Sequence, residues 1–132
     1  MASATTQLKQ HLEDEIGKCQ PKDVAARIDD LDTLEAVLTG NRVEEEIDLL
    51  SGLANETRYK LVRLLVADGD ELCVCELNAM VDASESAISH ALATLNDAGL
   101  VTRRKDGRWR KYRATNAAVA IVTVLDGAIA DE

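Results

Sequence analysis

Residues 71–113 decide the fold and read ELCVCELNAMVDASESAISHALATLNDAGLVTRRKDGRWRKYR. In the first part of this stretch, apolar residues recur every three to four positions within two short segments. That spacing puts each apolar set on one face of a helix, and we expect the two faces to share a core. The positions that carry the pattern are Leu77, Val81, Ile88, Leu92 and Leu95.

A short turn separates the two predicted helices. Asp82-Ala83-Ser84 supplies it, and Ser84 is a residue type that caps helix N-termini. Gly99 is expected to follow the end of the second helix, because glycine adopts the left-handed backbone conformation that is common there. The start of this helix carries small or polar side chains that lie off the apolar stripe and can enter a DNA major groove. They are Glu85, Ser86, Ser89 and His90.

After Gly99 the pattern changes from helical to extended, and Asp106-Gly107 lies between two short runs. This pair predicts a β-hairpin with a type I′ turn, because both residues tolerate a positive φ. The hairpin forms a wing beside the two helices, and Trp109 and Tyr112 are predicted to pack it onto the core. Its basic side chains are Arg103, Arg104, Lys105, Arg108, Arg110, Lys111 and Arg113.

Charge is distributed unevenly along the chain. The 15 basic and 24 acidic side chains give a net charge of −9, which alone argues against nucleic-acid binding. Residues 99–115, however, hold seven of the basic side chains and a single acid, Asp106. The side chains predicted to position the wing on phosphates or in the minor groove are Arg103, Arg104, Arg108, Arg110 and Lys111. The acid excess elsewhere suggests a protein kept soluble in concentrated salt.

A chain of 132 residues is expected to form one domain with one core. No apolar run approaches the roughly 20 residues of a membrane span, and the first residues are unlike a signal sequence, so we expect a cytoplasmic protein that does not bind a membrane. The three cysteines are an odd number, and only one residue separates Cys73 from Cys75. Because that arrangement is poor for a structural disulfide, we expect reduced thiols.

Cys73 and Cys75 are candidate ligands for a soft ion. Thiolates favour arsenite, antimonite, cadmium, lead or zinc over magnesium or calcium. Residues two apart on an α-helix point roughly 200° apart around its axis, so joint ligation requires extended or unwound backbone over residues 72–75. Binding would then distort the start of the first helix, which supports the second one. Such a differential interaction is what a ligand-operated switch requires.

The same residues resemble the ArsR/SmtB family of winged-helix metalloregulatory repressors. ELCVCEL at residues 71–77 is similar to the family's ELCVC(D/E)L box. SESAISHALATLNDAGLV at residues 84–101 and RRKDGRWRKYR at residues 103–113 are similar to its recognition helix and wing. The resemblance covers about residues 47–113.

The resemblance implies a mainly α winged helix-turn-helix fold with a small β-hairpin that dimerises through terminal helices. The implied function is that of a homodimeric repressor without enzymatic activity, which binds double-stranded operator DNA and needs no cofactor to do so. In the arsenic-responsive branch, arsenite or antimonite at the thiolates releases the DNA. Members of that branch often have a third cysteine where this chain has Asn78. Cys19 is the candidate substitute, from the same chain or from across the dimer, and the alternative is that it is an idle thiol.

We divide the chain into four segments. Residues 1–20 are predicted to be a mobile N-terminal arm, and residues 21–40 an additional amphipathic helix. Residues 41–115 are the predicted DNA-binding domain. Residues 116–132 are the predicted dimerisation helix, because a helix that is apolar over so much of its surface needs a partner.

Three other functions fit part of the pattern. The cysteines of a redox or sulfur-sensing repressor would be oxidised instead of binding an ion. A small thiol enzyme such as a metalloid reductase would need an oxyanion-binding loop and a base near a cysteine, and the sequence offers neither convincingly. A third function is constitutive DNA binding with a vestigial cysteine box.

Overall fold

The computed structural model describes residues 2–17 and 20–130. The chain forms two compact units, residues 1–43 and residues 44–132. Every side chain that is buried in the described part of the chain belongs to the second unit. None of the helices within the described ranges is both long enough and apolar enough to cross a membrane.

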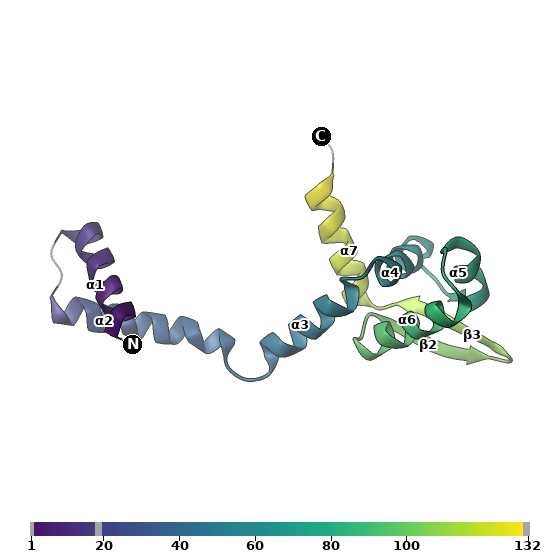
Figure 1. Cartoon of the computed structure of the whole chain (residues 1–132), viewed down its shortest axis with the longest axis horizontal. Helices are drawn as coiled ribbons and strands as arrows, with labels where there is room; N and C mark the ends of the chain where they lie inside the picture. The colour runs from purple at the N-terminus through teal and green to yellow at the C-terminus, as the bar shows by residue number, and fades with distance from the viewer. Residues whose placement is uncertain (1, 18–19, 131–132) are drawn as a thin grey trace. The chain divides into compact units, whose positions relative to one another are not determined.

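The first unit is built from two helices and a short 3₁₀ segment (Figure 1). α1 spans Ala2–Ile16, α2 spans Pro21–Glu35 and η1 spans Ala36–Leu38. The helix that we expect over residues 21–40 is therefore present as α2, and it tightens into η1 before it ends.

The segment that we predict to be a mobile arm, residues 1–20, contains α1. Leu8 and Leu12 are half-buried on this helix while most of its other side chains are exposed. Because these two leucines are four residues apart, they lie on one face. α1 packs against α2, so the pair supplies an apolar contact that the polar composition of the segment conceals.

The second unit is a set of helices with a three-stranded sheet and a terminal helix. Its elements in chain order are α3 (Arg42–Leu53), α4 (Glu56–Asp68), β1 (Leu72–Cys73), α5 (Val74–Met80), α6 (Glu85–Asp97), β2 (Val101–Asp106), β3 (Trp109–Ala114) and α7 (Asn116–Ile129). The first residues of α3 lie at the boundary between the two units. The mainly α winged-helix architecture that the sequence predicts is confirmed.

The core of this unit is formed where α4, α5, α6 and the sheet meet. The apolar positions from which both helices were predicted are all buried, and Leu77, Ile88 and Leu92 have no exposed surface. Leu61 and Leu65 complete the core from α4. Burial of side chains of this size contributes about 1.5–3 kcal/mol each, so this cluster is the main source of stability.

The predicted helix boundaries are confirmed. The Oγ atom of Ser84 accepts a hydrogen bond from the backbone N–H of Ala87 at 3.0 Å, as expected of the cap of α6. Gly99 follows the helix with φ 79°. A side-chain cap also begins α4, where the side chain of Asn55 accepts a hydrogen bond from the backbone N–H of Arg58 at 3.0 Å.

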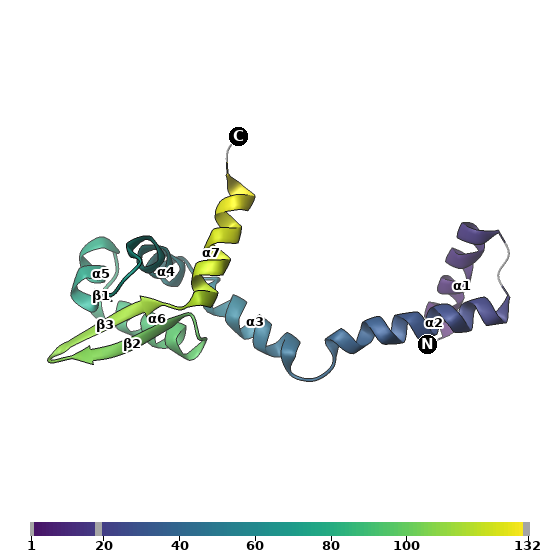
Figure 2. The same ribbon diagram turned by 180° about the vertical axis from the view of Figure 1, so that it is seen from behind.

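The strands form one antiparallel sheet in the order β1-β3-β2. β2 and β3 are the predicted wing, and their turn projects past α5 and α6 in both views of the ribbon (Figures 1 and 2). β1 pairs with the other edge of β3, with Leu72 opposite Tyr112 and Cys73 opposite Lys111. The thiol segment is therefore part of the same sheet as the wing.

The turn of the wing differs in type from the prediction. Asp106 and Trp109 are the last paired residues, so Gly107 and Arg108 form a two-residue loop. Gly107 has φ 63°, and no described residue other than glycine has a positive φ. A single positive φ at the first central position is the pattern of a type II′ turn, whereas the predicted type I′ turn needs two.

The two aromatic residues of the wing lie in different environments. Tyr112 is 3% exposed and packs against the core, as predicted. Trp109 is 45% exposed, which corrects the same prediction for this residue. Its place beside the turn puts it too far from the core, and its ring stacks instead on Arg108, whose Cζ atom lies 4.7 Å from the ring centroid.

Alanine at position 52 should lower the free energy of unfolding by about 1–3 kcal/mol. A Cβ atom on Gly52 would lie 2.9 Å from the Cβ atom of Ala98 and 3.4 Å from a Cδ atom of Leu100. The Ala98 Cβ atom is fixed to the backbone that follows α6, so α3 must move away to accept the methyl group. Urea unfolding of Gly52→Ala measures the loss.

Gly127→Ala is the matched control for this substitution. Gly127 lies inside α7, and a Cβ atom there has no neighbour within 4 Å. Alanine loses less backbone entropy than glycine in a helix, so this variant should gain about 0.5–1 kcal/mol. If Gly52→Ala gained stability as well, the close approach of α3 to the end of α6 would be contradicted.

Candidate nucleic-acid interface and thiol site

One face of α6 is buried and the other is open to solvent. Ile88, Leu92 and the other apolar residues hold the helix on the core. The side chains that we predict to read DNA, which are Glu85, Ser86, Ser89 and His90, are all exposed at the N-terminal half of the helix. The exposed face carries acceptors and hydroxyl groups but no lysine or arginine.

An open depression of about 470 Å³ lies at the start of α6. Ser86 and His90 line it from α6, and Asn55, Thr57 and Arg58 line it from the start of α4. These three residues were not predicted to contact DNA, because the only feature that the sequence shows there is the helix cap at Asn55. The depression is polar and adjoins the predicted reading face, so it extends the candidate interface onto α4.

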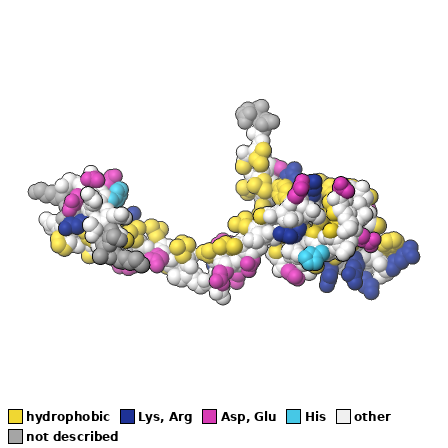
Figure 3. Space-filling model, in the orientation of Figure 1, with side chains coloured by type: hydrophobic (Ala, Val, Ile, Leu, Met, Phe, Trp, Pro, Cys, Tyr) yellow, Lys and Arg dark blue, Asp and Glu magenta, His cyan; other side chains and the backbone are white. Residues whose placement is uncertain are grey.

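The wing carries the concentrated positive charge, and Figure 3 shows its Lys and Arg side chains gathered around the hairpin at the lower right of the second unit. Arg103, Lys105, Arg108 and Arg110 are exposed and form no ion pair within the described residues. Lys111 is bound to Asp106, with Nζ 3.2 Å from a carboxylate oxygen. Arg104 and Arg113 bind acids outside the wing.

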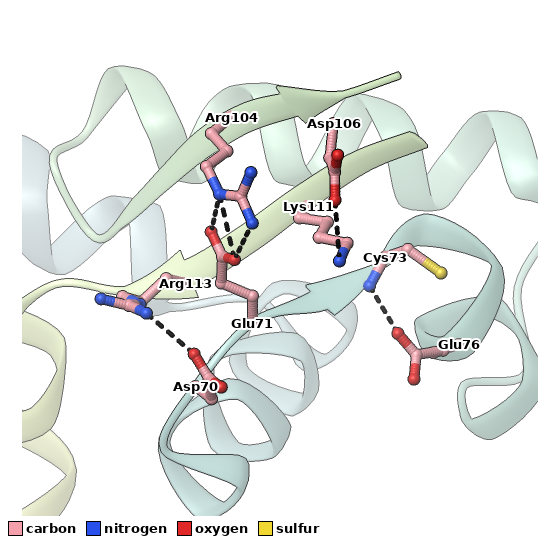
Figure 4. A network of polar contacts seen from close by, with 8 residues as sticks. All are labelled: Asp70, Glu71, Cys73, Glu76, Arg104, Asp106, Lys111 and Arg113. Atoms are coloured by element: carbon pink, nitrogen blue, oxygen red, sulfur yellow. Dashed lines mark hydrogen bonds and ion pairs between the residues drawn. The ribbon is translucent and has the colours of Figure 1, made fainter. Parts of the chain in front are cut away.

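Those acids are Glu71 and Asp70, directly ahead of β1 (Figure 4). Glu71 accepts hydrogen bonds from Nε and Nη2 of Arg104, the shortest at 2.7 Å, and Asp70 accepts from Nη2 of Arg113 at 2.8 Å. The hydrogen bonds from Arg104 lower the pKa of Glu71 below its ordinary value of 4.5, and partial burial opposes this shift. Neither ion pair was predicted from the sequence.

Glu71→Gln should make acid unfolding of the protein less steep below pH 4.5. A carboxyl group whose pKa is lower when folded adds stability above its unfolded pKa and loses it as the pH falls through the folded pKa. The neutral amide has no such dependence. Circular dichroism from pH 6 to pH 2 on both proteins measures the difference, and two curves of equal steepness would contradict the ion pair.

The two cysteines of the box converge where a strand becomes a helix. Cys73 has extended backbone with φ −84° and ψ 163°, and Cys75 lies in the first turn of α5. Their Cα atoms are 5.4 Å apart, and their sulfur atoms are joined in a disulfide. The backbone is extended at residues 72–73 only, because Val74 and Cys75 already belong to α5, so the expected extended or unwound segment over residues 72–75 is half present and the sulfur atoms meet across the strand-to-helix junction.

The disulfide corrects our expectation of reduced thiols at these positions. We expected that two cysteines separated by one residue would not form a disulfide. Because Cys73 is extended and Cys75 is helical, however, their Cα atoms lie within the ordinary disulfide range. Cys73 is 8% exposed, whereas Cys75 is exposed. A pair in this position can either form a bond or bind one thiophilic atom.

Cys73 also begins α5. Its N–H donates to Oε1 of Glu76 at 2.8 Å, so the Glu76 side chain reaches back to the N-cap as in a capping box. Cys19 lies outside the described residues. Within the described residues, no group of three or more His, Cys, Asp or Glu side chains is placed to hold a metal ion.

Comparison with known proteins places this arrangement in a family. The family described as bacterial regulatory protein, arsR family, matches residues 55–103, from the cap of α4 to β2. A Halobacterium salinarum protein, assigned as an arsenical resistance operon repressor named ArsR, is 50% identical over 125 residues, which cover 95% of this chain and 97% of the relative. The chain belongs to the arsR family.

Other arsR relatives match a smaller share of the chain. CadC of Listeria innocua, a cadmium resistance transcriptional regulatory protein, is 40% identical over 67 residues, which cover 51% of this chain and 56% of the relative. The structure of HlyU from Vibrio cholerae has a TM-score of 0.62 and 29% identity, and the match covers 70% of this chain and 100% of that one. As an arsR family member the chain is a transcription regulator and not an enzyme.

Proposed function

We propose that this arsR family protein is a repressor that responds to a trivalent metalloid. It binds operator DNA as a homodimer, and it releases the DNA when arsenite or antimonite binds the thiolates of Cys73 and Cys75. Cadmium, lead and zinc are further candidate inducers, because soft thiolates suit them as well. The names of relatives as arsenical and cadmium resistance regulators support this range of inducers.

The observation that carries the proposal is the position of the two sulfur atoms. They lie side by side at the junction of β1 and α5, so, once the disulfide is reduced, one thiophilic atom can bind both. Cys73 is paired with the wing through Lys111, and α5 packs on α6 through the buried Leu77. A ligand that moves either cysteine therefore acts on both candidate DNA-contacting elements.

DNA recognition is divided between two elements in this proposal. α6 enters the major groove, where Glu85 accepts from a cytosine amino group and the polar Ser86, Ser89 and His90 contact bases or phosphates. The wing binds phosphates or the minor groove through its unpaired cations, above all Arg103, Arg108 and Arg110. Lys111 contributes less, because it already has Asp106 as its counterion.

Exposed apolar side chains in the second unit support the homodimer. On α7, Ala118 and Val122 are buried against the core, whereas Val124 and Ile129 are 68% and 76% exposed. α3 exposes Leu50 to a similar extent. A second copy of the chain would cover these side chains, and two copies would also match two half-sites one helical turn apart.

Binding to the DNA upstream of the protein's own gene tests the proposal. The protein is reduced with a phosphine, because a thiol reductant would compete for arsenite, and DNA binding is followed by mobility shift. Arsenite or antimonite should weaken binding roughly 5- to 150-fold, the usual range for coupled sites, and magnesium should have no effect. Absence of DNA binding, or binding unchanged by every soft ion, would overturn the proposal.

The disulfide favours a second candidate function, a thiol-based redox repressor. Oxidation of Cys73 and Cys75 to the bond seen in the structure would pass two electrons and two protons to an oxidant. In that case an oxidant alone should release DNA and remove two titratable thiols per chain. Release by arsenite under reducing conditions, without release by oxidant, would exclude it.

Arg110→Gln should reduce the salt dependence of operator binding. Each phosphate contact contributes about −0.9 to the slope of log K against log salt concentration, so loss of one contact per chain should lower the slope by about one for each bound chain. Lys60→Gln is the control, because Lys60 is already paired with Glu56 on α4. Titrations at several salt concentrations measure both slopes. Equal slopes for Arg110→Gln and the wild type would contradict phosphate binding by this arginine.

A further inference from the structure

The two acidic residues ahead of the thiol strand reach across to the wing. Glu71 holds the guanidinium group of Arg104 in a fork, with Nε 2.9 Å from Oε2 and Nη2 2.7 Å from Oε1. Asp70 holds Arg113 through a single hydrogen bond. Figure 4 shows both carboxylates directed from the chain just before β1 toward the strands of the wing.

The Glu71–Arg104 pair spans the whole sheet. Arg104 belongs to β2, the outer strand of the wing, while Glu71 adjoins β1 at the opposite edge, and β3 lies between them. The side chain of Glu71 is only 17% exposed, so solvent screens this pair less than an ordinary surface ion pair. The wing is thus joined to β1 by side chains as well as by the hydrogen bonds of β3.

Glu71 is also closely connected to the thiol pair. Only Leu72 separates it from Cys73, and Leu72 is held opposite Tyr112 in the sheet. Alternate residues of extended chain lie on the same side of the backbone, so Glu71 and Cys73 are expected to move together. If a bound atom displaces Cys73, β1 moves with it, and the ion pair between Glu71 and Arg104 passes this movement on to Arg104.

We propose that Glu71 and Asp70 are positioning residues that transmit the state of the thiol pair to the wing. This inference rests on the proposed function and names the link between its two sites. A metalloid atom that binds both thiolates holds the two sulfur atoms farther apart than the disulfide does, so Cys73 and the start of β1 move, and Arg104 and Arg113 carry the strands of the wing with them. The ion pairs supply a physical connection between the two sites, through which a shift at one reaches the other.

The role of Arg104 changes accordingly. We predicted from the sequence that it binds phosphate, but its guanidinium group is already engaged by Glu71 through Nε and Nη2. In this proposal it stays paired when DNA binds, and its neighbour Arg103 faces the phosphates instead. Arg104 therefore acts through Glu71 and is not itself a DNA contact.

The test compares Glu71→Gln, Arg104→Gln and the double variant with the full-length wild type. Glu45→Gln is the matched control, because it removes an exposed carboxylate of α3 that has no ion pair in the described structure. For each protein we measure arsenite binding by loss of titratable thiols. We also measure operator affinity with and without arsenite, and the dependence of that affinity on salt. Urea unfolding confirms that each variant is folded.

Both single variants should bind arsenite like the wild type. The release factor is the operator affinity without arsenite divided by the affinity with arsenite, and in both variants it should fall at least threefold. The double variant should match the single ones, because each change breaks the same connection. Arg104→Gln should keep the wild-type salt slope. Wild-type release by Glu71→Gln, or a salt slope lowered by about one per chain in Arg104→Gln, would overturn the inference. If the wild type itself keeps its DNA in arsenite, the proposed function fails, and the inference fails with it.

Discussion

Arsenite should no longer release operator DNA from Cys75→Ser, whereas the affinity of this variant for DNA without arsenite should stay within about twofold of the wild type. A serine hydroxyl is a hard, neutral donor and cannot replace a thiolate toward a soft atom. Cys75 is exposed in the first turn of α5, so the substitution leaves the core intact. Fluorescence anisotropy of labelled operator DNA, with and without arsenite, measures both affinities.

Asn78→Ser is the control on the same helix. Asn78 is exposed on α5 and carries no thiol, so this variant should release DNA as the wild type does. If Cys75→Ser retained the wild-type release factor, the thiol pair would not be the inducer site. The wild type in oxidant without arsenite separates the two proposed functions, whereas Cys75→Ser does not, because both functions need both sulfur atoms.

The helices that carry the candidate DNA interface could be predicted because their signals are local. A helix period places Leu77 and Ile88 in the core, and a serine cap fixes the start of α6 at Ser84. The other side chains at the start of α6 lie off the apolar face, so they could be expected to be exposed. The wing was predictable for a similar reason, since Asp106-Gly107 marks a hairpin locally, although the two-residue loop itself is Gly107-Arg108.

The link between the thiol pair and the wing could not be predicted, because it depends on contacts between residues distant in the sequence. β1 has two residues, too few to show a strand period, and its partner β3 begins at Trp109. Glu71 and Arg104 are 33 residues apart, and either alone looks like an ordinary surface charge. Charge counting along the wing therefore assigned Arg104 to DNA, whereas the structure gives it an acidic partner.

The disulfide and the exposed tryptophan were missed for a different physical reason. Whether two cysteines separated by one residue can meet depends on the backbone of the first, and Cys73 is extended only because it pairs with β3. Trp109 and Tyr112 are both large aromatic residues of β3, so residue type alone predicts that each is buried. They differ in their distance from the turn. Only Tyr112 lies opposite β1, where the sheet covers the core.

Leu92→Ala should lower the free energy of unfolding by about 2–5 kcal/mol, which is a large part of the roughly 5–15 kcal/mol that a domain has. Leu92 has no exposed surface and joins α6 to the core, so alanine leaves a cavity lined by other apolar side chains. Met80→Ala on α5 is the control, because Met80 is 53% exposed and its loss opens no cavity. Urea unfolding of both variants gives the comparison.

Because α6 also carries the candidate reading face, Leu92→Ala should lose operator affinity at urea concentrations at which Met80→Ala still binds. A loss of stability no larger than that of Met80→Ala would mean that α6 is not held by this core.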